Sequence, residues 1–351
     1  MVTVAITGVA GLLGSSLAAE LDGNTAVDRI VGLDLAAPHQ VSSDKLAFRE
    51  VDIRDPNFDR YLDDVDVLVH LAFQMDPIRD LDTMRSINID GTRNVFEAAV
   101  RAGVDKVVYN SSAVAYGAHP DNDFPLTEDS PLRANPGFPY AEHKLELERW
   151  LDEWLREHDD DLTVTVLRPT VVAGPGVDNF ITRMSFESPR PVLVRGHRPP
   201  LQFVHVEDVV SALVHVIEED LPGAFNVSAE GWLSMDEVLA VAGRKPAEVP
   251  EEVAFTTTER LWDLGLSEAQ PGVVPYYMHP WVVSPEKLIE TGWRPKRSNR
   301  DALAQLVEEH RDWIAVGTLR ARRSTLRRIA AVTGLLAGAA TVRAIVRRRR
   351  S

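Results

Sequence analysis

Val2-Thr3-Val4-Ala5-Ile6-Thr7-Gly8-Val9-Ala10-Gly11-Leu12-Leu13-Gly14 is the stretch that decides the fold of this 351-residue chain. An apolar run of strand length leads into three glycines, and helix-like sequence over Leu12–Leu21 follows directly. Glycine at such a turn lets the backbone approach a pyrophosphate, whose charge then lies at a helix N-terminus. Asp34 closes the second strand twenty residues beyond Gly14, where it can accept hydrogen bonds from an adenosine ribose. The stretch therefore predicts a dinucleotide-binding βαβ unit.

Buried strands alternate with amphipathic helices through the first half of the chain. Strands are predicted over Val2–Thr7, Ile30–Asp34, Leu46–Asp52, Val67–His70, Lys106–Asn110 and Thr163–Arg168. Helices are predicted over Leu12–Leu21, Thr83–Ala102 with Gly103 as its C-cap, and Pro139–His158. Because most of the strand runs are continuously apolar, they suit a parallel sheet buried on both faces. The order predicts an α/β fold with a doubly wound parallel Rossmann sheet, whose ligand lies outside the carboxyl ends of the strands.

The texture of the sequence changes after Gly174-Pro175 to short, proline-rich segments. The length of the chain also favours two lobes over one core. We therefore predict an NAD-binding Rossmann domain over residues 1–175, to which residues 203–222 return with a helix at Val206–Glu218. Residues 176–202 and 223–316 are predicted to form a smaller α/β substrate-binding lobe, and residues 317–351 a basic amphipathic helical tail.

Composition narrows the class of protein. At 44% hydrophobic and 26% charged residues the chain is globular, and the absence of cysteine excludes disulfides and thiolate metal sites. Met1 leads straight into an apolar run without a charged leader or a cleavage site, which predicts a cytoplasmic location. No group of His, Asp and Glu has the spacing of a metal site.

Basic charge is concentrated at the C-terminus. Thr318–Ser351 contains ten arginines and no acidic residue, and since the whole chain has a net charge of −15, the rest carries about −25. Within it, Ile329–Val346 is rich in Ala, Gly and Leu, and its eighteen residues are at the lower limit for crossing a bilayer. A helix peripheral at the inner membrane face is favoured, with a solvated tail as the alternative; whether the segment spans, lies on or avoids a membrane stays open. Nucleic-acid binding is disfavoured because the tail has no aromatic residue and the body is acidic.

The residues after Asp34 favour NAD over NADP. Asp34 would repel a 2′-phosphate, and Leu35-Ala36-Ala37 offers no basic side chain to neutralise one. Asp52-Ile53, which ends the third strand, is placed to meet the adenine edge of the cofactor. The alternative for Asp52 is a strand-end carboxylate in water.

Two further segments carry groups suited to hydride-transfer chemistry. Tyr140 and Lys144 are four residues apart on the helix Pro139–His158, so the phenol and the ammonium share a face. A free tyrosine has a pKa of about 10, and an ammonium together with an oxidised nicotinamide would favour the phenolate. Tyr109-Asn110-Ser111-Ser112-Ala113-Val114-Ala115-Tyr116-Gly117 directly follows a buried strand, so that a serine hydroxyl stands in the crevice, able to hold a substrate oxygen.

With these motifs the chain resembles the extended short-chain dehydrogenase/reductases, the NAD-dependent epimerase/dehydratases. Further matches, in the family's order and within residues 1–316, are His70-Leu71-Ala72, Asn88-Ile89-Asp90-Gly91-Thr92-Arg93-Asn94, Arg168-Pro169, Gly174-Pro175, Phe203-Val204-His205-Val206-Glu207-Asp208, Phe225-Asn226-Val227-Ser228 and Gly292-Trp293-Arg294-Pro295. The motifs are specific for the family and not for a substrate.

The resemblance implies roles for individual residues. Ser112 would be the catalytic serine, Tyr140 the acid/base, and Lys144 would bind the nicotinamide ribose and lower the pKa of the tyrosine. The cofactor-side residues carried over are Gly8, Gly11, Gly14, Asp34, Asp52, Ile53, Ala72, Asn88, Tyr140 and Lys144. Phe73 departs from the small residue usual after Ala72 and is expected to tighten the crevice there.

The reaction is narrowed by the residues beside the serine. Ser112 is followed by Ala113 and Val114 and not by the Asp-Glu pair of family dehydratases, so dehydration is disfavoured. The motif is more similar to that of UDP-galactose 4-epimerases, which implies a nucleotide-sugar substrate contacted by Asn179; of the nearby Arg195 and Arg198, we expect Arg198 to bind the diphosphate. Leu201 stands where such members carry an arginine, so an apolar alcohol of the hydroxysteroid kind is an alternative.

Other residues have simpler interpretations. His70 and His205 are predicted to be hydrogen-bonded structural histidines, and Trp150 and Trp154 to be core or subunit-contact residues. The family often dimerises through the helix that carries the tyrosine, which implies a homodimer. A Rossmann protein that senses NAD without turnover is the competing class, disfavoured because Ser112, Tyr140 and Lys144 are all present.

Overall fold

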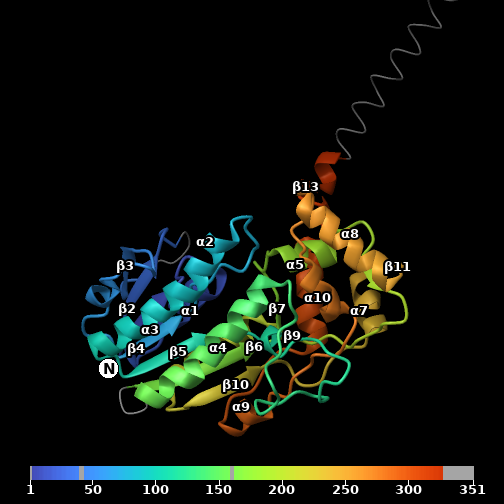
Figure 1. The fold of residues 1–351 in the computed structure, drawn as a ribbon. Helices are drawn as coiled ribbons and strands as arrows, with labels where there is room; N and C mark the ends of the chain where they lie inside the picture. The colour runs from blue at the N-terminus through green and yellow to red at the C-terminus, as the bar shows by residue number, and fades with distance from the viewer. Residues whose placement is uncertain (1, 39–42, 159–161, 327–351) are drawn as a thin grey trace, which may run out of the picture.

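The computed structural model describes residues 2–38, 43–158 and 162–326, and a seven-stranded parallel sheet dominates it (Figure 1). The strands run in the order β10-β6-β5-β4-β1-β2-β3. Their bounds are β1 Val2–Thr7, β2 Val27–Asp34, β3 Leu46–Glu50, β4 Val67–His70, β5 Lys106–Asn110, β6 Thr163–Pro169 and β10 Gly223–Val227. The chain order reverses between β1 and β4, which places the ligand crevice of a doubly wound sheet beside their carboxyl ends.

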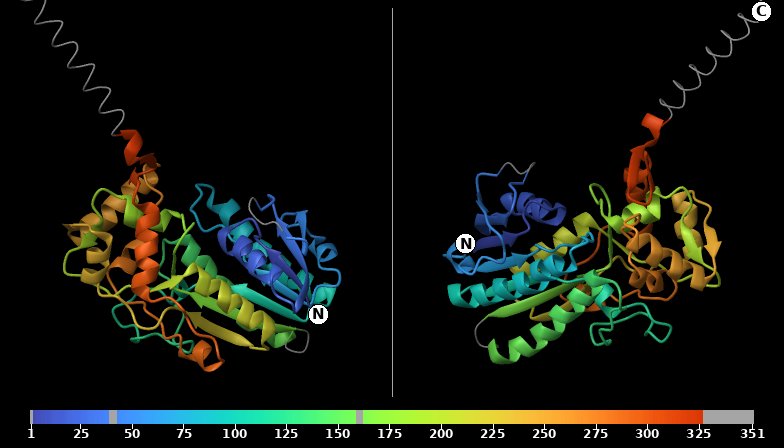
Figure 2. Two further views of the ribbon diagram at one scale, coloured as in Figure 1. Left: turned by 180° about the vertical axis from the view of Figure 1, so that it is seen from behind. Right: turned by 45° about the horizontal axis from the view of Figure 1, so that its top comes forward.

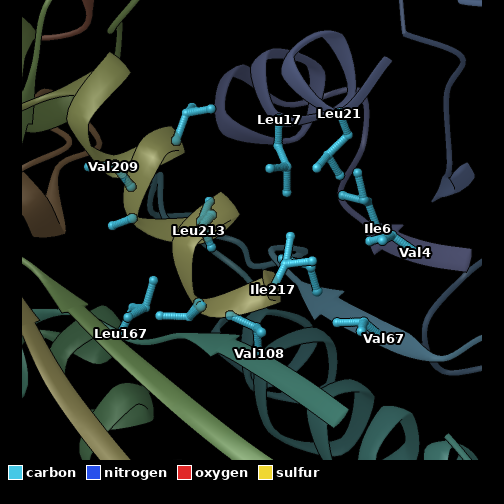
Figure 3. Packing of buried hydrophobic residues seen from close by; sticks show 14 of the residues in the cluster. Val4, Ile6, Leu17, Leu21, Val67, Val108, Leu167, Val209, Leu213 and Ile217 are labelled. Carbon is cyan, nitrogen blue, oxygen red and sulfur yellow. The ribbon is translucent and has the colours of Figure 1, made fainter. Parts of the chain in front are cut away.

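Helices cover both faces of this sheet. On one face lie α1 (Leu12–Asp22) and α6 (Val206–Glu218), and on the other α3 (Gly91–Ala102) and α4 (Pro139–His158). Figure 3 shows the first face, where Leu17 of α1 and Leu213 of α6 point at buried side chains of the strands, Ile6 and Val108 among them. Because both faces are packed in this way, the strands are apolar at nearly every position.

A second lobe gathers beside the sheet, as both views of Figure 2 show. Its helices are α5 Phe180–Thr182, α7 Met235–Ala242, α8 Glu251–Asp263 and α10 Asn299–His310, with turns η4 Arg183–Glu187 and η5 Pro271–Tyr277. Three two-stranded sheets accompany them, formed by β7 Val171–Ala173 with β9 Phe203–His205, β8 Val192–Val194 with β11 Ala247–Val249, and β12 Trp313–Val316 with β13 Leu319–Arg322. The short elements of the first lobe are η1 Phe58–Tyr61, α2 Leu81–Arg85, η2 Ser86–Asp90, η3 Ala113–Tyr116 and α9 Glu286–Glu290.

The strands and helices predicted within residues 1–218 are confirmed in type, and two of the helices also in both of their end residues. Pro139–His158 and Val206–Glu218 begin and end at the predicted residues. Gly103 caps α3 in the left-handed region with φ 71°, as predicted. The single helix predicted over Thr83–Ala102 is wrong in one respect, because a π-helical turn at Ser86–Asp90 separates α2 from α3. Such turns insert one residue into a helix and leave little trace in hydrophobic periodicity.

The boundary between the lobes differs from the one predicted. The sequence predicts residues 223–316 in the second lobe, but Gly223–Val227 forms β10, the edge strand of the large sheet. The segment around α9 also packs there, and Leu288 and Trp293 belong to the core beneath α1 and α6. Long-range pairing to β6 decides this placement, and no local pattern marks it.

The predicted helical tail at 317–351 begins instead with a strand. Leu319–Arg322 pairs antiparallel with Trp313–Val316 through a turn at Gly317, whose φ of 60° favours glycine. Residues 327–351, which hold the segment Ile329–Val346, lie outside the described residues. Within the residues that the structure describes, no helix is both long and apolar enough to cross a membrane.

Candidate active site

The glycine turn lies against the end of β4. Gly8 has φ 73°, a conformation that favours glycine, and a Cβ added there would come within 2.7 Å of the Ala72 backbone nitrogen. A Cβ at Gly14 would collide with the Gly8 carbonyl oxygen, so α1 can start close to the turn only with glycine at this position. Packing within the protein therefore accounts for two of the three glycines, Gly8 and Gly14.

The third glycine fits a ligand better than it fits protein packing. A Cβ at Gly11 would meet one atom within 4 Å, the Gly8 oxygen at 3.3 Å, so the protein itself leaves room for a side chain. Gly11 is the N-cap of α1 and gives no side-chain cap, and the first turn holds no acidic residue. The amides at this end thus meet no carboxylate of their own helix, which suits a pyrophosphate.

Asp34 ends β2 beside the same turn. Its Oδ2 accepts a hydrogen bond from the Ala10 amide at 2.9 Å, and its Oδ1 accepts one from the Leu35 amide at 2.7 Å. A carboxylate oxygen can accept more than one hydrogen bond, so both oxygens keep capacity for ribose hydroxyls. The following Leu35-Ala36-Ala37 is exposed and carries no base, which suits NAD.

The pair expected at the adenine edge is engaged by protein groups. Arg54 binds the Asp52 carboxylate at 2.6 Å and lowers the pKa of Asp52. Ile53 is buried, and a Cβ on Gly91 would come within 2.6 Å of its Cδ1, so Ile53 packs tightly under α3. Adenine would therefore have to share the Asp52 carboxylate with Arg54, and a contact between adenine and Asp52 remains a proposal.

Ser112 and Tyr140 meet at the carboxyl end of β5. Ser112 is the N-cap of η3, and its Oγ accepts a hydrogen bond from the Val114 amide at 3.3 Å. Tyr140 lies in the first turn of α4. Burial raises the pKa of Tyr140, and a hydrogen bond with the Ser112 side chain acts in the opposite direction. The structure thus brings together the hydroxyl and the phenol that the sequence singled out.

Lys144 lies one turn further along α4 with 2% of its surface exposed. Its Nζ donates to the Asn110 carbonyl oxygen at 2.7 Å and to the Tyr109 hydroxyl at 3.3 Å. Burial lowers the pKa of Lys144 to about 7, against a raising effect of Glu148. Burial is the larger influence on the phenol, and a lowering of the Tyr140 pKa by Lys144 remains a proposal.

A buried ion pair supports this helix from beneath. Glu148 and Arg168 approach to 2.6 Å, with side chains 4% and 8% exposed. The Ser111 hydroxyl donates to Glu148, and Arg168 donates to the Tyr116 hydroxyl at 2.7 Å. Sequence reasoning missed Glu148, although it follows Lys144 by four residues on the same face. The pair joins α4 to β6.

Hydrogen bonds of Asn88 and Ala72 fix the loop after β4. The Asn88 side chain accepts from the Gln74 amide at 2.7 Å and donates to the Gln74 carbonyl at 3.0 Å. It also contacts His143 Nδ1 at 3.2 Å. The Ala72 amide donates to Thr7 Oγ1 at 3.2 Å. Asn88 is therefore placed to shape the loop beside the cofactor crevice, and a direct cofactor contact remains a proposal.

The two histidines expected to be structural are hydrogen-bonded. His70 lies between Thr7 Oγ1 at 2.7 Å and Thr92 Oγ1 at 2.9 Å, and burial lowers its pKa to about 3. His205 contacts Gln305 at 3.0 Å and caps α6. Among the described residues, no group of three or more His, Asp and Glu is arranged to hold a metal ion.

An aromatic wall surrounds Tyr140 and was not predicted. Its members are Phe73, Phe138, Phe180, Tyr276, Tyr277 and Trp281. The Phe138 ring centroid lies 5.8 Å from that of Tyr140, 6.0 Å from Phe180 and 5.8 Å from Tyr276. Most of these residues come from loops or short turns far apart in sequence, so periodicity gives no signal for them.

The predicted substrate-side residues bind protein groups. Asn179 is the N-cap of α5, and its Oδ1 accepts from the amides of Ile181 and Thr182, both at 3.1 Å. Arg198 is exposed and binds Glu248, with Asp236 at 4.0 Å. Its described contacts thus lie within the second lobe. Arg183, which sequence reasoning missed, binds Asp76 of the first lobe at 2.8 Å.

Known proteins resemble the chain over most of its length. The family model described as "NAD dependent epimerase/dehydratase family" matches residues 4–228. A UDP-glucose 4-epimerase of Mycolicibacterium smegmatis is 30% identical over 88% of this chain and 98% of its own. The dTDP-D-glucose 4,6-dehydratase of Mus musculus is 25% identical, with 88% of each chain covered. The structure of MoeE5 in complex with UDP-glucuronic acid and NAD superposes with a TM-score of 0.69 at 25% identity, covering 88% of this chain and 99% of that one.

Replacing Glu148→Gln should destabilise the fold by about 3 kcal/mol, because it leaves the Arg168 guanidinium buried without a counter-charge. The free energy of unfolding in urea measures this. Glu157→Gln, at an exposed position of the same helix, is the matched control and should change stability by less than about 0.5 kcal/mol. The double variant Glu148→Leu with Arg168→Met should recover much of the loss. Equal stability of Glu148→Gln and Glu157→Gln would contradict the role given to the pair.

Proposed function

We propose that this chain, which belongs to the NAD-dependent epimerase/dehydratase family, oxidises a hydroxyl-bearing carbon of a nucleotide sugar with Tyr140 as the acid/base. As a member of this family it is an NAD-dependent enzyme, and NAD is its cofactor. The observation that carries the proposal is the meeting of Ser112, Tyr140 and Lys144 at the carboxyl end of β5. The nucleotide sugars of its relatives support the substrate class.

Each part of the crevice has a proposed task toward the cofactor. When bound, NAD supplies the hydride acceptor. The amides after Gly11 bind the pyrophosphate, and Asp34 binds the adenosine ribose. Lys144 binds the nicotinamide ribose through its ammonium.

Tyr140 and Ser112 act on the substrate. The Ser112 hydroxyl orients the substrate oxygen against Tyr140, and the phenolic oxygen takes the proton of the reacting hydroxyl. Since burial raises the pKa of Tyr140, positive charge close to the phenol is needed before it can act as a base near neutral pH. The Lys144 ammonium, which donates to the Asn110 carbonyl oxygen at 2.7 Å, contributes part of that charge.

Epimerisation is favoured over dehydration. Ala113 and Val114, which follow Ser112, are buried and apolar, so no acid stands beside the serine to expel a hydroxyl group. In an epimerase Tyr140 would return its proton to the substrate oxygen, and bound NAD would serve as both acceptor and donor of the hydride. NAD is then unchanged after each turnover.

A second candidate is oxidation of an apolar alcohol of the hydroxysteroid kind. The aromatic wall around Tyr140 supports it, since it makes the surroundings of the phenol apolar. Leu201 lies where nucleotide-sugar enzymes are expected to carry an arginine, and Arg198 is held by Glu248. A non-catalytic NAD sensor is the third class, which the intact set of Ser112, Tyr140 and Lys144 disfavours.

Tyr140→Phe should abolish turnover, by about 10²-fold or more, because it removes the proton-transferring oxygen. NAD affinity, measured by fluorescence titration, should stay within about twofold, since the ring and its packing are retained. A panel of UDP-sugars and hydroxysteroids supplies the substrate. An epimer without net NADH supports the nucleotide-sugar proposal, whereas accumulated NADH with a hydroxysteroid supports the second candidate. An active Tyr140→Phe enzyme would contradict the acid/base role; NAD binding by the wild type without any turnover would support the sensor.

A homodimer through α4 is part of the proposal, on the basis of the family resemblance. The exposed positions of α4 are charged, with Arg149, Asp152 and Arg156 among them, so the interface would be polar. Light scattering at micromolar protein should give twice the mass of one chain. A monomeric mass at that concentration would refute the dimer.

We also propose a peripheral location at the inner membrane face. Arginines of the C-terminal segment would attract anionic lipid, and exposed leucines lie where the chain enters it. Leu319 is 78% and Leu264 70% exposed. A Cβ at Gly317 would collide with the Leu266 carbonyl oxygen, so the β12–β13 turn and the end of α8 are adjacent.

Removal of residues 327–351 should abolish binding to anionic vesicles, because seven of the ten C-terminal arginines are lost while β13 is kept. Co-sedimentation with phosphatidylglycerol vesicles is the measurement, and phosphatidylcholine vesicles are the uncharged control. Equal sedimentation of the full and shortened chains would rule the proposal out.

A further inference from the structure

Phe73 covers the ammonium of Lys144. Its ring centroid lies 3.6 Å from Lys144 Nζ, closer than that of Tyr109 at 4.7 Å. The same ring meets Tyr140 edge-on, with centroids 5.7 Å apart and planes at 83°. A single side chain from the loop after β4 therefore contacts two of the three groups that act at the crevice.

The hydrogen-bond partners of Lys144 show which side of its ammonium Phe73 covers. An ammonium has three N–H donors. Two of them are directed at the Asn110 carbonyl, 2.7 Å away, and the Tyr109 hydroxyl, 3.3 Å away. The face of Phe73 lies against the same nitrogen and takes the remaining side. A cation is attracted to an aromatic face, most strongly when it is desolvated, and Lys144 is 2% exposed.

The loop that carries Phe73 is fixed on its C-terminal side by both lobes. Gln74 is bound at its amide and its carbonyl by Asn88. Asp76 accepts a hydrogen bond from the Phe180 amide at 2.9 Å and pairs with Arg183 at 2.8 Å, both in the second lobe. With the backbone held in this way, the ring can leave Lys144 by rotating about its side-chain bonds, and the loop need not move.

We propose that Phe73 competes with the nicotinamide ribose of NAD for the third donor of Lys144. This inference rests on the proposed role of Lys144 as the ribose-binding group. The aromatic face shields the ammonium in its water-poor site. When NAD binds, the ring turns away and the ribose takes the donor, so the affinity for NAD is lowered by the interaction that is given up.

Phe73→Ala should therefore bind NAD about fivefold to tenfold more tightly than the wild type, with faster association of NADH. Fluorescence titration and stopped-flow mixing of the purified full chain measure these quantities without turnover. Phe73→Leu keeps an apolar side chain and removes the aromatic face, so it should also bind more tightly. Phe73→Tyr keeps the face and should bind as the wild type does.

Phe124→Ala is the matched control. Phe124 is 50% exposed and packs against Trp232, outside the crevice, and its removal should leave NAD affinity unchanged. Thermal unfolding checks that each variant is folded. Unchanged or weaker NAD binding by Phe73→Ala would overturn the proposal, as would wild-type affinity of Phe73→Leu, because the ring would then act by its bulk alone.

The two proposals fail in different ways. If the wild type does not bind NAD, the proposed function is lost. If it binds NAD and Tyr140→Phe is inactive, but the Phe73 variants bind as the wild type does, only the competition is refuted. A crystal structure with NAD adds a direct test, since the Phe73 ring should then lie more than about 6 Å from Lys144 Nζ.

Discussion

The burial of two charged side chains one turn apart on α4 is the constraint on which the site depends. Lys144 is held by the Asn110 carbonyl at the end of β5, and Glu148 by Arg168 at the end of β6. Removing a charge from water is unfavourable unless strong partners replace the water, so α4 is stable only in the register that supplies both. That register places Tyr140, one turn before Lys144, beside Ser112. The meeting of Tyr140 with Ser112 is thus a consequence of the charge compensation beneath it.

The loop after β4 links the cofactor crevice to the second lobe through hydrogen bonds and an ion pair. Thr7 Oγ1 accepts hydrogen bonds from the amides of Leu71 and Ala72. The Asn88 side chain is hydrogen-bonded to Gln74, and Asp76 forms an ion pair with Arg183. The glycine turn is packed against Ala72, so the cofactor crevice and the lobe-to-lobe contact share one segment of about six residues. Asp76 thus joins the segment that carries Phe73 to the second lobe.

Local patterns in the sequence were sufficient for much of this. The turn at Gly8, the helix Pro139–His158 and the strand before Ser111 follow from short-range composition and are confirmed, as is the parallel, doubly wound class of the sheet. What escaped prediction depends on partners far apart in the chain. β10 is a strand because β6 offers it an edge, and Glu148 matters because Arg168 lies 20 residues later. The π-turn at Asn88 and the β12–β13 hairpin within the expected tail likewise depend on tertiary contacts.

The ion pairs of Arg183 and Arg198 determine how easily the protein could bind the phosphates of a nucleotide sugar. A nucleotide diphosphate brings two phosphate groups that need cationic or amide donors, whereas an apolar alcohol needs none. Arg183 is bound by Asp76, Asp178 and Glu268, and Arg198 by Glu248. To bind a diphosphate, either arginine would have to exchange its carboxylate partners for phosphate oxygens. The released carboxylates would then repel the ligand unless they turned toward solvent. Glu248 is partly exposed and can do so, while Asp76 also holds the Phe180 amide and cannot leave without loosening the lobe contact. A diphosphate would therefore be better served by Arg198 than by Arg183, whereas a hydrocarbon skeleton would require neither exchange.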